Sequence, residues 1–183
     1  MNPLVVRNSY SESKRMCETL ITSFASEYHV PAMCIRLAQT FGAGVQKDDT
    51  RVFAEFARCA VEGQDITLLT VGSSKRCYLY TMDAVSAIIT VMLKGEAGKA
   101  YNAGNPNTYC SIKEMADMVV AQIADSQIKV IVSEDLEGSK KFSPTHFYRL
   151  DVRELEQLGW RADKCLINMY KAMIEVWQDE SCN

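Results

Sequence analysis

The stretch YSESKRMCETL, residues 10–20, decides how the fold of this 183-residue chain is interpreted. It places a tyrosine and a lysine four positions apart, Tyr10 and Lys14, within a run whose apolar residues keep helical spacing. Positions i and i+4 lie on one face of a helix, so the phenol and the ammonium point the same way. The spacing therefore predicts a helix over 8–29 that carries a tyrosine suited to accept a proton.

The same spacing also occurs by chance in many helices. A half-exposed tyrosine beside a solvated lysine is the ordinary alternative, and the Tyr10/Lys14 pair alone does not exclude it. The interpretation therefore depends on the segments downstream of the pair.

Composition excludes several classes of protein. The chain is 48% hydrophobic and 23% charged, and its net charge is −3 from 20 Lys+Arg and 23 Asp+Glu. No basic run marks a nucleic-acid-binding surface, and no apolar run is long enough to span a membrane. The first ten residues, MNPLVVRNSY, lack the pattern of a signal peptide. We expect a protein that binds neither nucleic acid nor membrane.

Seven cysteines raise the question of a metal site or a disulfide framework. Their number is odd, they are widely scattered, and no CxxC pair occurs. Most lie in apolar runs, where a reduced cysteine behaves as a small hydrophobic residue. We expect no metal site and a reducing, cytoplasmic location.

Helical and strand patterns alternate along the rest of the chain. The expected strands are 32–38, 65–70, 76–81, 100–104 and 128–132. The expected helices are 50–63, 84–95, 111–124, 151–160 and 166–178.

Local signals set several of these boundaries. Pro31 ends the first helix, and Gly63 and Gly95 are expected at helix C-termini. Asp83 is a candidate N-cap, and Ser111 with Glu114 forms a capping-box pattern. Residues 105–107 are expected to form a turn, 133–147 a surface loop, and Trp160 and Trp177 packing positions.

Five segments together resemble the extended short-chain dehydrogenases/reductases of the NAD-dependent epimerase/dehydratase family. YSESKRMCETL resembles the active-site helix, and CIRLAQTFGAG resembles the strand and loop that come after it. Three further segments match in the same order: ITLLTVGSSKRCYLYTMDAVSAI, AYNAGNPNTYCSIKEMADMV and RLDVRELEQLGWRADKCLINMYKAMIEVW. Because the five segments cover nearly the whole chain, coincidence is not a serious alternative.

The resemblance implies an α/β fold: the C-terminal part of a Rossmann-type enzyme, with the N-terminal dinucleotide-binding strands missing. Residues 1–49 would be a remnant of the Rossmann domain, and 50–183 mainly the substrate-binding region, with short returns to the sheet. The glycine-rich turn that holds the NAD pyrophosphate lies upstream of the tyrosine in this family. We therefore expect this chain alone to bind NAD poorly and to be inactive or slow.

The resemblance also assigns roles to individual residues. Tyr10 matches the catalytic base, and Lys14 matches the lysine that holds the nicotinamide ribose. Gln39 takes the place of an asparagine that touches the bound sugar nucleotide. Arg76 matches an arginine that binds the diphosphate, a role that suits a guanidinium because it pairs bidentately with phosphate oxygens.

Two further substrate contacts are less close matches. Arg51 and Val52 stand at the start of the helix that usually contacts the nucleotide base. His146 lies near the place of a second phosphate-binding arginine, and an ordinary surface histidine is the alternative there. Leu37, Phe41 and Cys77 also depart from the family pattern, which leaves the identity of the substrate open.

The resemblance leaves two functions open. The first is part of an NAD-dependent nucleotide-sugar epimerase, dehydratase or decarboxylase, in which Tyr10 and Lys14 support hydride transfer at sugar C4. The second is a nucleotide-sugar-binding module without redox activity, with a UDP-, dTDP- or GDP-linked ligand. In either case the apolar stripe that contains Met16, Leu20 and Phe24 predicts a homodimer, or self-association, through the helix 8–29.

Overall fold

The structure is a computed structural model, and it describes residues 4–133 and 145–181. The helices are η1 (Val6–Asn8), α1 (Ser9–Tyr28), α2 (Val52–Glu62), α3 (Thr81–Lys94), α4 (Ile112–Gln122), α6 (Arg153–Gln157) and α7 (Leu166–Ser181). The strands are β1 (Cys34–Leu37), β2 (Gln39–Phe41), β3 (Ile66–Leu68), β4 (Lys75–Tyr80), β5 (Ala100–Ala103), β6 (Asn105–Ser111), β7 (Val130–Val132) and β8 (Phe147–Tyr148).

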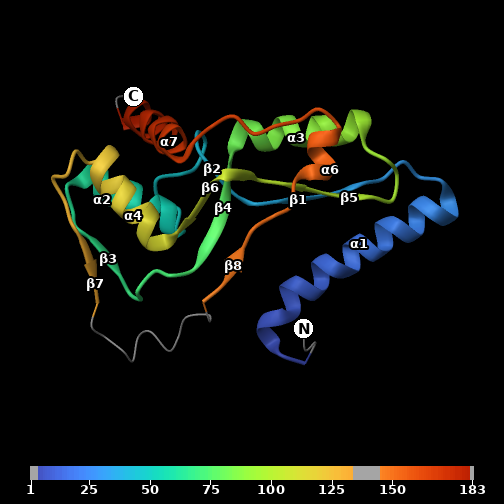
Figure 1. Cartoon of the computed structure of the whole chain (residues 1–183), viewed down its shortest axis with the longest axis horizontal. Coiled ribbons are helices and arrows are strands. Elements are labelled where there is room, and N and C mark those ends of the chain that lie inside the picture. The colour runs from blue at the N-terminus through green and yellow to red at the C-terminus, as the bar shows by residue number, and fades with distance from the viewer. Residues whose placement is uncertain (1–3, 134–144, 182–183) are drawn as a thin grey trace.

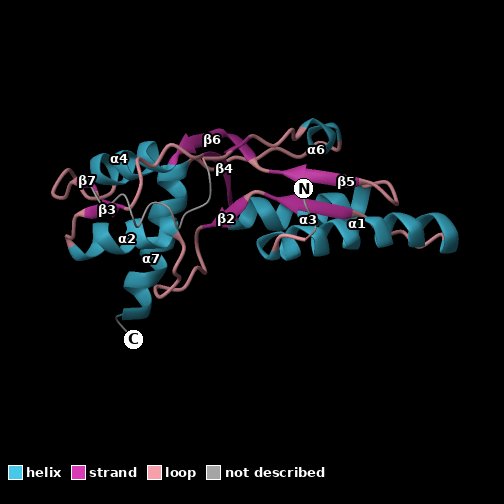
Figure 2. Cartoon of the chain, turned by 90° about the horizontal axis from the view of Figure 1, so that it is seen from below, coloured by secondary structure: helices cyan, strands magenta, loops and turns pink. Residues whose placement is uncertain are grey.

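The molecule is elongated, with strands along its length and helices around them (Figure 1). One end holds the β1–β5 pair with α1, α3 and α6. The other end holds α2, α4 and α7 with the β3–β7 pair, as the second view also shows (Figure 2). Strands β2, β4 and β6 lie between the two ends.

A parallel pair of strands organises the first end. β1 and β5 pair from Cys34↔Ala100 to Leu37↔Ala103. In Figure 1, α3 lies above this pair and α1 below it. The β5 side is closed by α6 and the segment before it, where Asn102 Nδ2 donates to the Asp151 carbonyl at 2.9 Å. Helices on both faces of a parallel pair are typical of α/β proteins.

Strand β4 is the centre of the middle sheet. It pairs in parallel with β2 and β8 and antiparallel with β6. Because successive side chains of a strand point to opposite faces, Tyr78 and Leu79 are buried in two different hydrophobic clusters. β4 therefore joins the cores of the two ends.

The larger core is built around aromatic side chains. The rings of Phe41 and Phe53 stack with their centroids 4.5 Å apart, and Tyr170 of α7 contacts Phe41 edge-on at 5.1 Å. Trp177 is also buried, and its indole Nε1 donates to the Val45 carbonyl at 2.6 Å. The prediction of a packing role for this tryptophan is confirmed.

The smaller core lies under α3. Ala87, Tyr101, Leu155 and Trp160 pack together there, and Trp160 Nε1 donates to the Ser86 hydroxyl at 2.9 Å. The predicted packing role of Trp160 is therefore also confirmed.

Two helix boundaries follow their sequence signals. Gly63 ends α2 with a φ of 66°, a left-handed conformation that glycine adopts without steric cost. At the start of α4, the Ser111 hydroxyl accepts from the Glu114 N–H at 3.0 Å, and the Glu114 carboxylate accepts from the Ser111 N–H at 2.6 Å. The predicted capping box is confirmed.

The expected start of α3 was wrong, whereas the helix does end at the predicted Gly95. β4 runs directly into the helix, which begins at Thr81, so Asp83 lies in its first turn. The Asp83 carboxylate instead accepts from the backbone N–H groups of Asp163 and Lys164, each at 3.2 Å. Gly95 follows the helix in an extended conformation rather than a left-handed one.

Two expected loops also contain strands. Residues 105–107, expected to turn, begin β6, and the buried Asn105 side chain accepts from the Asn107 N–H at 2.9 Å. Within the expected loop 133–147, Phe147 begins β8 beside β4, whereas residues 134–144 lie outside the described part of the chain. The strand expected over 32–38 is shorter than predicted, because only β1 falls within it; β2 begins beyond it, at Gln39, where the chain changes its pairing partner from β5 to β4.

Helix α1 is attached to the sheet by polar contacts rather than by burial, since none of its residues is buried. The Arg36 guanidinium of β1 binds the Glu18 carboxylate through two hydrogen bonds of 2.7 and 2.5 Å. Thr22 Oγ1 lies 3.3 Å from the Gly98 carbonyl. The hydrogen bond from Arg36 lowers the pKa of Glu18.

None of the helices described here is both long enough and apolar enough to cross a bilayer.

The Ser111 capping box gives a first test of the fold. Replacing Ser111 with alanine leaves the Glu114 N–H without its acceptor, so we expect a loss of about 1 kcal/mol in the free energy of unfolding. Urea denaturation followed by circular dichroism measures this value. Ser13→Ala is the matched control, because that hydroxyl bonds only its own helix at the Tyr10 carbonyl. Equal stability of the two variants would contradict the assignment.

The Glu18–Arg36 pair predicts a pH-dependent attachment of α1. Because the folded pKa of Glu18 is lowered, the stabilisation is complete above its usual pKa of 4.5 and is lost as the pH falls below that value. The pair is partly exposed, so its contribution is below about 1 kcal/mol.

Amide exchange in α1, compared between the protein and Glu18→Gln at each pH, measures this effect. We expect exchange up to about fivefold faster in the variant at pH 7 and a smaller difference at pH 3. Glu62→Gln, which breaks a partly exposed ion pair away from α1, is the control. A difference between protein and variant that is the same at both pH values would exclude this attachment.

Candidate active site

The predicted catalytic pair lies on the first half of α1. Tyr10 is 69% exposed, and the Lys14 Nζ lies over its ring, 5.6 Å from the ring centroid. Lys14 forms no ion pair with any described carboxylate. The helix therefore presents a phenol and an uncompensated ammonium on one face, as the spacing predicts.

A groove of about 520 Å³ runs between α1 and β1 beside this pair. Its walls come from the two elements and the residue before β1: Tyr10, Lys14, Cys17, Glu18, Ile21, Met33, Cys34, Ile35, Arg36 and Leu37. Burial and the nearby Glu18 charge raise the pKa of Cys34, so this thiol stays protonated near neutral pH. Cys34 is thus no thiolate, and the phenol and the ammonium are the groups at the groove that the sequence predicts for proton transfer.

The chain leads from this groove directly to a second group of predicted residues. Leu37 lines the groove, and Gln39 begins β2 two residues later. The Gln39 amide oxygen accepts a hydrogen bond of 3.2 Å from Arg76 Nη1 on the adjacent strand β4. Two of the predicted substrate-binding residues are therefore in direct contact.

Arg76 carries an uncompensated charge. Its Nε is buried and has no hydrogen-bond partner among the described residues, and none of their carboxylates pairs with it. The groups packed nearby are neutral: burial raises the pKa of Cys110 to about 11 and that of Tyr78 still higher. A buried guanidinium donor without an acceptor costs free energy unless a ligand supplies one. This arrangement suits an anion.

Strand β8 brings His146 and Tyr148 to the same strand edge. The register pairs Arg76 with Tyr148, and the Lys75 N–H donates to the His146 carbonyl at 2.8 Å. The His146 and Tyr148 rings stack with their centroids 5.3 Å apart. Sequence reasoning assigned Tyr148 no role; the alternation of an extended segment would have placed it on the same side as His146.

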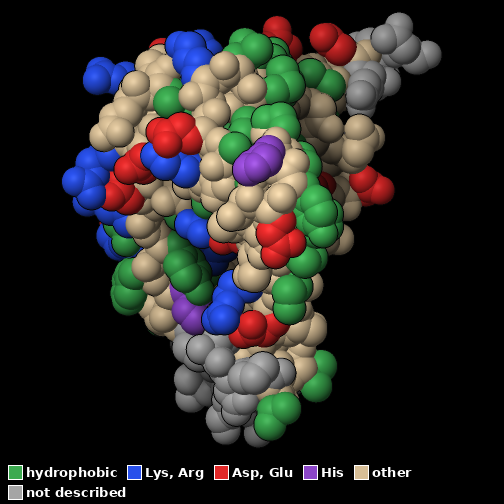
Figure 3. All heavy atoms as spheres, turned by 90° about the vertical axis from the view of Figure 1, so that its right-hand side faces the viewer, with side chains coloured by type: hydrophobic (Ala, Val, Ile, Leu, Met, Phe, Trp, Pro, Cys, Tyr) green, Lys and Arg blue, Asp and Glu red, His purple; other side chains and the backbone are tan. Residues whose placement is uncertain are grey.

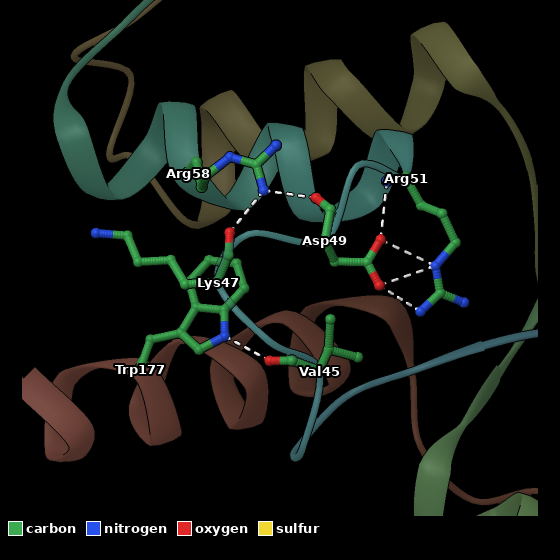
Figure 4. A network of polar contacts seen from close by, with 6 residues as sticks. All are labelled: Val45, Lys47, Asp49, Arg51, Arg58 and Trp177. Carbon is green, nitrogen blue, oxygen red and sulfur yellow. Dashed lines mark hydrogen bonds and ion pairs between the residues drawn. The ribbon is translucent and has the colours of Figure 1, made fainter.

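Arg51 and Val52 occupy the start of α2, at the end of a tightly held loop (Figure 4). The Asp49 carboxylate accepts from both Nε and Nη2 of Arg51, at 3.0 and 2.5 Å. Arg58 Nη1 fixes the same loop by donating to the Lys47 and Asp49 carbonyls, at 2.7 and 2.6 Å. A ligand that uses the Arg51 guanidinium would have to compete with Asp49, whose pKa this contact lowers.

The predicted residues therefore fall into three groups: Tyr10 with Lys14 on α1, Arg51 with Val52 at the start of α2, and Gln39 with Arg76 on β2 and β4. Gln39 and Arg76 are in contact, and β8 lies beside Arg76. No hydrogen bond or ion pair within residues 4–133 and 145–181 joins these groups to Tyr10 and Lys14. Likewise, no cluster of three or more metal-binding side chains occurs among those residues.

The arrangement offers two kinds of chemistry, proton transfer at Tyr10 and anion binding at Arg76. Viewed from the end at which α1 finishes, the surface carries interspersed basic and acidic side chains with hydrophobic ones between them (Figure 3). On this face an anion would therefore meet individual cations among acidic side chains, and not a large basic patch.

Comparison with known proteins identifies relatives of this chain. The model of the NAD dependent epimerase/dehydratase family matches residues 1–104. UDP-glucuronic acid decarboxylase 3 of Arabidopsis thaliana is 31% identical over 132 residues, which are 72% of this chain and 38% of that protein. UDP-glucuronic acid decarboxylase 1 of Danio rerio is 27% identical over 161 residues, 87% of this chain and 37% of the relative.

Solved structures share the fold. UDP-glucose 4-epimerase from Thermotoga maritima, solved with UDP-glucose, superposes with a TM-score of 0.80 at 20% identity, over 94% of this chain and 54% of the epimerase. The dTDP-glucose 4,6-dehydratase from Bacillus anthracis, solved in complex with NAD, gives 0.76 at 18% identity, over 94% and 53%.

This chain thus spans about half the length of those two solved structures and less than two fifths of the two curated relatives. The predicted Rossmann-type α/β fold is confirmed. From the match over residues 1–104, the chain belongs to the NAD dependent epimerase/dehydratase family.

Proposed function

We propose that this chain forms the substrate-binding part of an NAD-dependent nucleotide-sugar enzyme. The observation that carries the proposal is the contact between Arg76 and Gln39, in which a buried guanidinium Nε lacks an acceptor. Arg76 would bind a diphosphate oxygen, Gln39 a hydroxyl or carbonyl group of the sugar nucleotide, and His146 would flank the diphosphate. Arg51 and Val52 would meet the nucleotide base at the start of α2.

Tyr10 and Lys14 would carry the proton chemistry. The exposed phenol would take a proton from a sugar hydroxyl at C4, and the ammonium over its ring would stabilise the phenolate and hold a ribose hydroxyl of the cofactor. Bound NAD would supply the hydride acceptor. The groove beside the pair and the unpaired Lys14 fit such a cofactor.

Among the possible reactions, we favour decarboxylation of a UDP-linked sugar acid. The support is the name shared by the two curated relatives, both of which are UDP-glucuronic acid decarboxylases. Epimerisation and dehydration begin with the same oxidation at C4 and remain the alternatives. The division of the chain at residues 49/50 into a cofactor part and a substrate part belongs to the same proposal.

A second candidate function is nucleotide-sugar binding without redox chemistry. The Gln39–Arg76 contact is built entirely from β2 and β4, so it does not depend on α1. Such a module would bind the same ligands and leave them unchanged.

We also propose that copies of this chain associate through α1. Met16, Leu20 and Phe24 are each about half exposed and lie along one side of the helix. An isologous contact would cover this stripe in both copies.

The anion site can be tested by titrating the protein with UDP-glucuronic acid and UDP-glucose in a calorimeter. We expect Arg76→Ala to weaken binding by about tenfold or more, because a charge-assisted hydrogen bond to the diphosphate is lost. Arg76→Lys should recover part of the affinity, since it keeps the charge but loses the bidentate geometry. Arg161→Ala, which removes an exposed arginine between α6 and α7, is the matched control. Unchanged affinity in Arg76→Ala would exclude the proposed site.

The catalytic role can be tested by joining this chain to the glycine-rich half of a decarboxylase relative. Assays with a panel of UDP-, dTDP- and GDP-sugars, UDP-glucuronic acid included, would then identify the product. We expect Tyr10→Phe to lower kcat at least about 100-fold, because the proton acceptor is removed. Tyr28→Phe is the control, an equally exposed tyrosine on the same helix. Equal activities of the two variants would exclude Tyr10 as the base, whereas binding without turnover in the unmutated protein would favour the binding module.

A further inference from the structure

Two cysteine thiols line the groove that contains Tyr10 and Lys14. Cys17 belongs to the wall formed by α1, and Cys34 to the wall formed by β1. Both thiols are free; Cys17 is exposed, and Cys34 is half-buried. The proposed proton transfer and anion binding use neither of them.

Cys17 faces the groove because of its place on α1. It follows Lys14 by three residues and precedes Ile21 by four, and residues at these spacings share one face of a helix. Lys14 and Ile21 also line the groove, so this face of α1 forms its wall. Tyr10, seven residues before Cys17, lies on the same face.

Cys34 faces α1 because of its place on β1. Side chains two residues apart in a strand lie on the same face, so Cys34 shares its face with Arg36. The Arg36 guanidinium crosses to α1 and binds the carboxylate of Glu18 at 2.7 and 2.5 Å. Glu18 is the residue next to Cys17, so this contact holds the two thiols on facing parts of the two walls. Burial and the Glu18 charge raise the pKa of Cys34, and Cys17 lies close enough to add to the rise.

Helix α1 can adjust to bring the two sulfur atoms together. None of its residues is buried, and polar contacts from Glu18 and Thr22 attach it to the β1–β5 end. A disulfide requires an S–S distance of about 2.05 Å and Cα atoms about 4.4–6.8 Å apart. A helix held by exposed polar contacts reaches such a geometry at a lower cost than a helix packed into a core.

We propose that Cys17 and Cys34 form a reversible disulfide that ties α1 to β1 and closes the groove beside Tyr10 and Lys14. The oxidant is a low-molecular-weight disulfide, such as oxidised glutathione. The exposed Cys17, as the thiolate, attacks one sulfur atom of this oxidant, forms a mixed disulfide with it and releases the first glutathione. The Cys34 thiol then loses its proton to solvent, and its sulfur displaces the second glutathione. Two protein thiols are thereby oxidised to one disulfide, and one glutathione disulfide is reduced to two thiols.

The consequence for activity rests on the proposed function, in which the groove receives the cofactor and the sugar. A disulfide across the groove would fix the separation of its two walls, so the groove could not open to admit a ligand between them. Reduction would free the walls again, a transient behaviour that is typical of disulfides outside oxidising compartments. Formation of the disulfide itself does not depend on what the groove binds.

The test is incubation of the 183-residue chain in a glutathione redox buffer, followed by digestion at acid pH and mass mapping of the cross-linked peptides. We expect Cys17–Cys34 as the main product, and its loss on addition of dithiothreitol. Amide exchange in α1 should slow at least about tenfold in the oxidised protein, because a cross-link restricts the detached helix. Cys17→Ser and Cys34→Ser should each abolish this slowing, whereas Cys165→Ser, which removes an exposed thiol outside the groove, should not.

Three results in the unmutated protein would overturn the proposal, and none of them depends on how well a variant folds. They are two thiols that stay reduced in the buffer, a main product that pairs either thiol with another cysteine, and a bridged protein whose α1 exchanges as fast as before.

The chain joined to the glycine-rich half of a decarboxylase relative separates this proposal from the proposed function. Activity that falls on oxidation and returns on reduction, but is insensitive to oxidation in Cys17→Ser, would support closure of the groove. Full activity of the bridged protein would contradict the closure. A mapped Cys17–Cys34 bridge in a joined protein that is inactive even when reduced would leave the disulfide intact and contradict the proposed function alone.

Discussion

The pairing of β1 with β5 is the constraint on which the rest of the structure depends. It joins residues 34–37 to residues 100–103, two segments separated in the chain by α2, α3 and the strands between them. Closing so long a loop costs conformational entropy that only the contacts made afterwards repay. Those contacts are the packing of α3 on the pair, the cover of β5 by α6, and the tie between Arg36 and Glu18 that holds α1. The placement of Tyr10 against the sheet thus follows from a pairing with a segment far along the chain.

The side chains of the proposed site differ in how firmly the fold holds them in place. Arg76 is held by a hydrogen bond to Gln39 in a neutral environment, so an anion would find a fixed donor. Arg51 is already engaged by Asp49, so its use by a ligand requires an exchange of partners. Tyr10 is held least firmly, because α1 contributes no buried residue and presents the phenol to solvent. The arginines proposed to bind the ligand and the tyrosine proposed to accept the proton therefore lie in parts of the fold that differ in rigidity.

Sequence reasoning predicted the parts governed by local rules. The helix carrying Tyr10 and Lys14, the Gly63 end of α2 and the Ser111–Glu114 capping box each depend on neighbours a few residues away, and each is confirmed.

The predictions that failed depend on partners distant in the sequence. Asp83 lies inside α3 because β4 runs directly into the helix at Thr81, and its carboxylate accepts from the backbone N–H groups of Asp163 and Lys164. Residues 105–107 begin a strand because Asn105 pairs with Tyr78 of β4. The contact between Gln39 and Arg76 was likewise beyond a local pattern, since it requires the register of β2 against β4. The family resemblance identified Gln39 and Arg76 one by one, and only the sheet shows that they lie side by side.

Strand β4 gives the molecule a mechanical property that neither end has alone. Tyr78 anchors it in the aromatic core, and the next residue, Leu79, anchors it in the core beneath α3. A strand held from both faces cannot leave one core while remaining in the other. The two ends are thus coupled in unfolding, and a cut between a cofactor part and a substrate part would pass through shared packing rather than through a hinge.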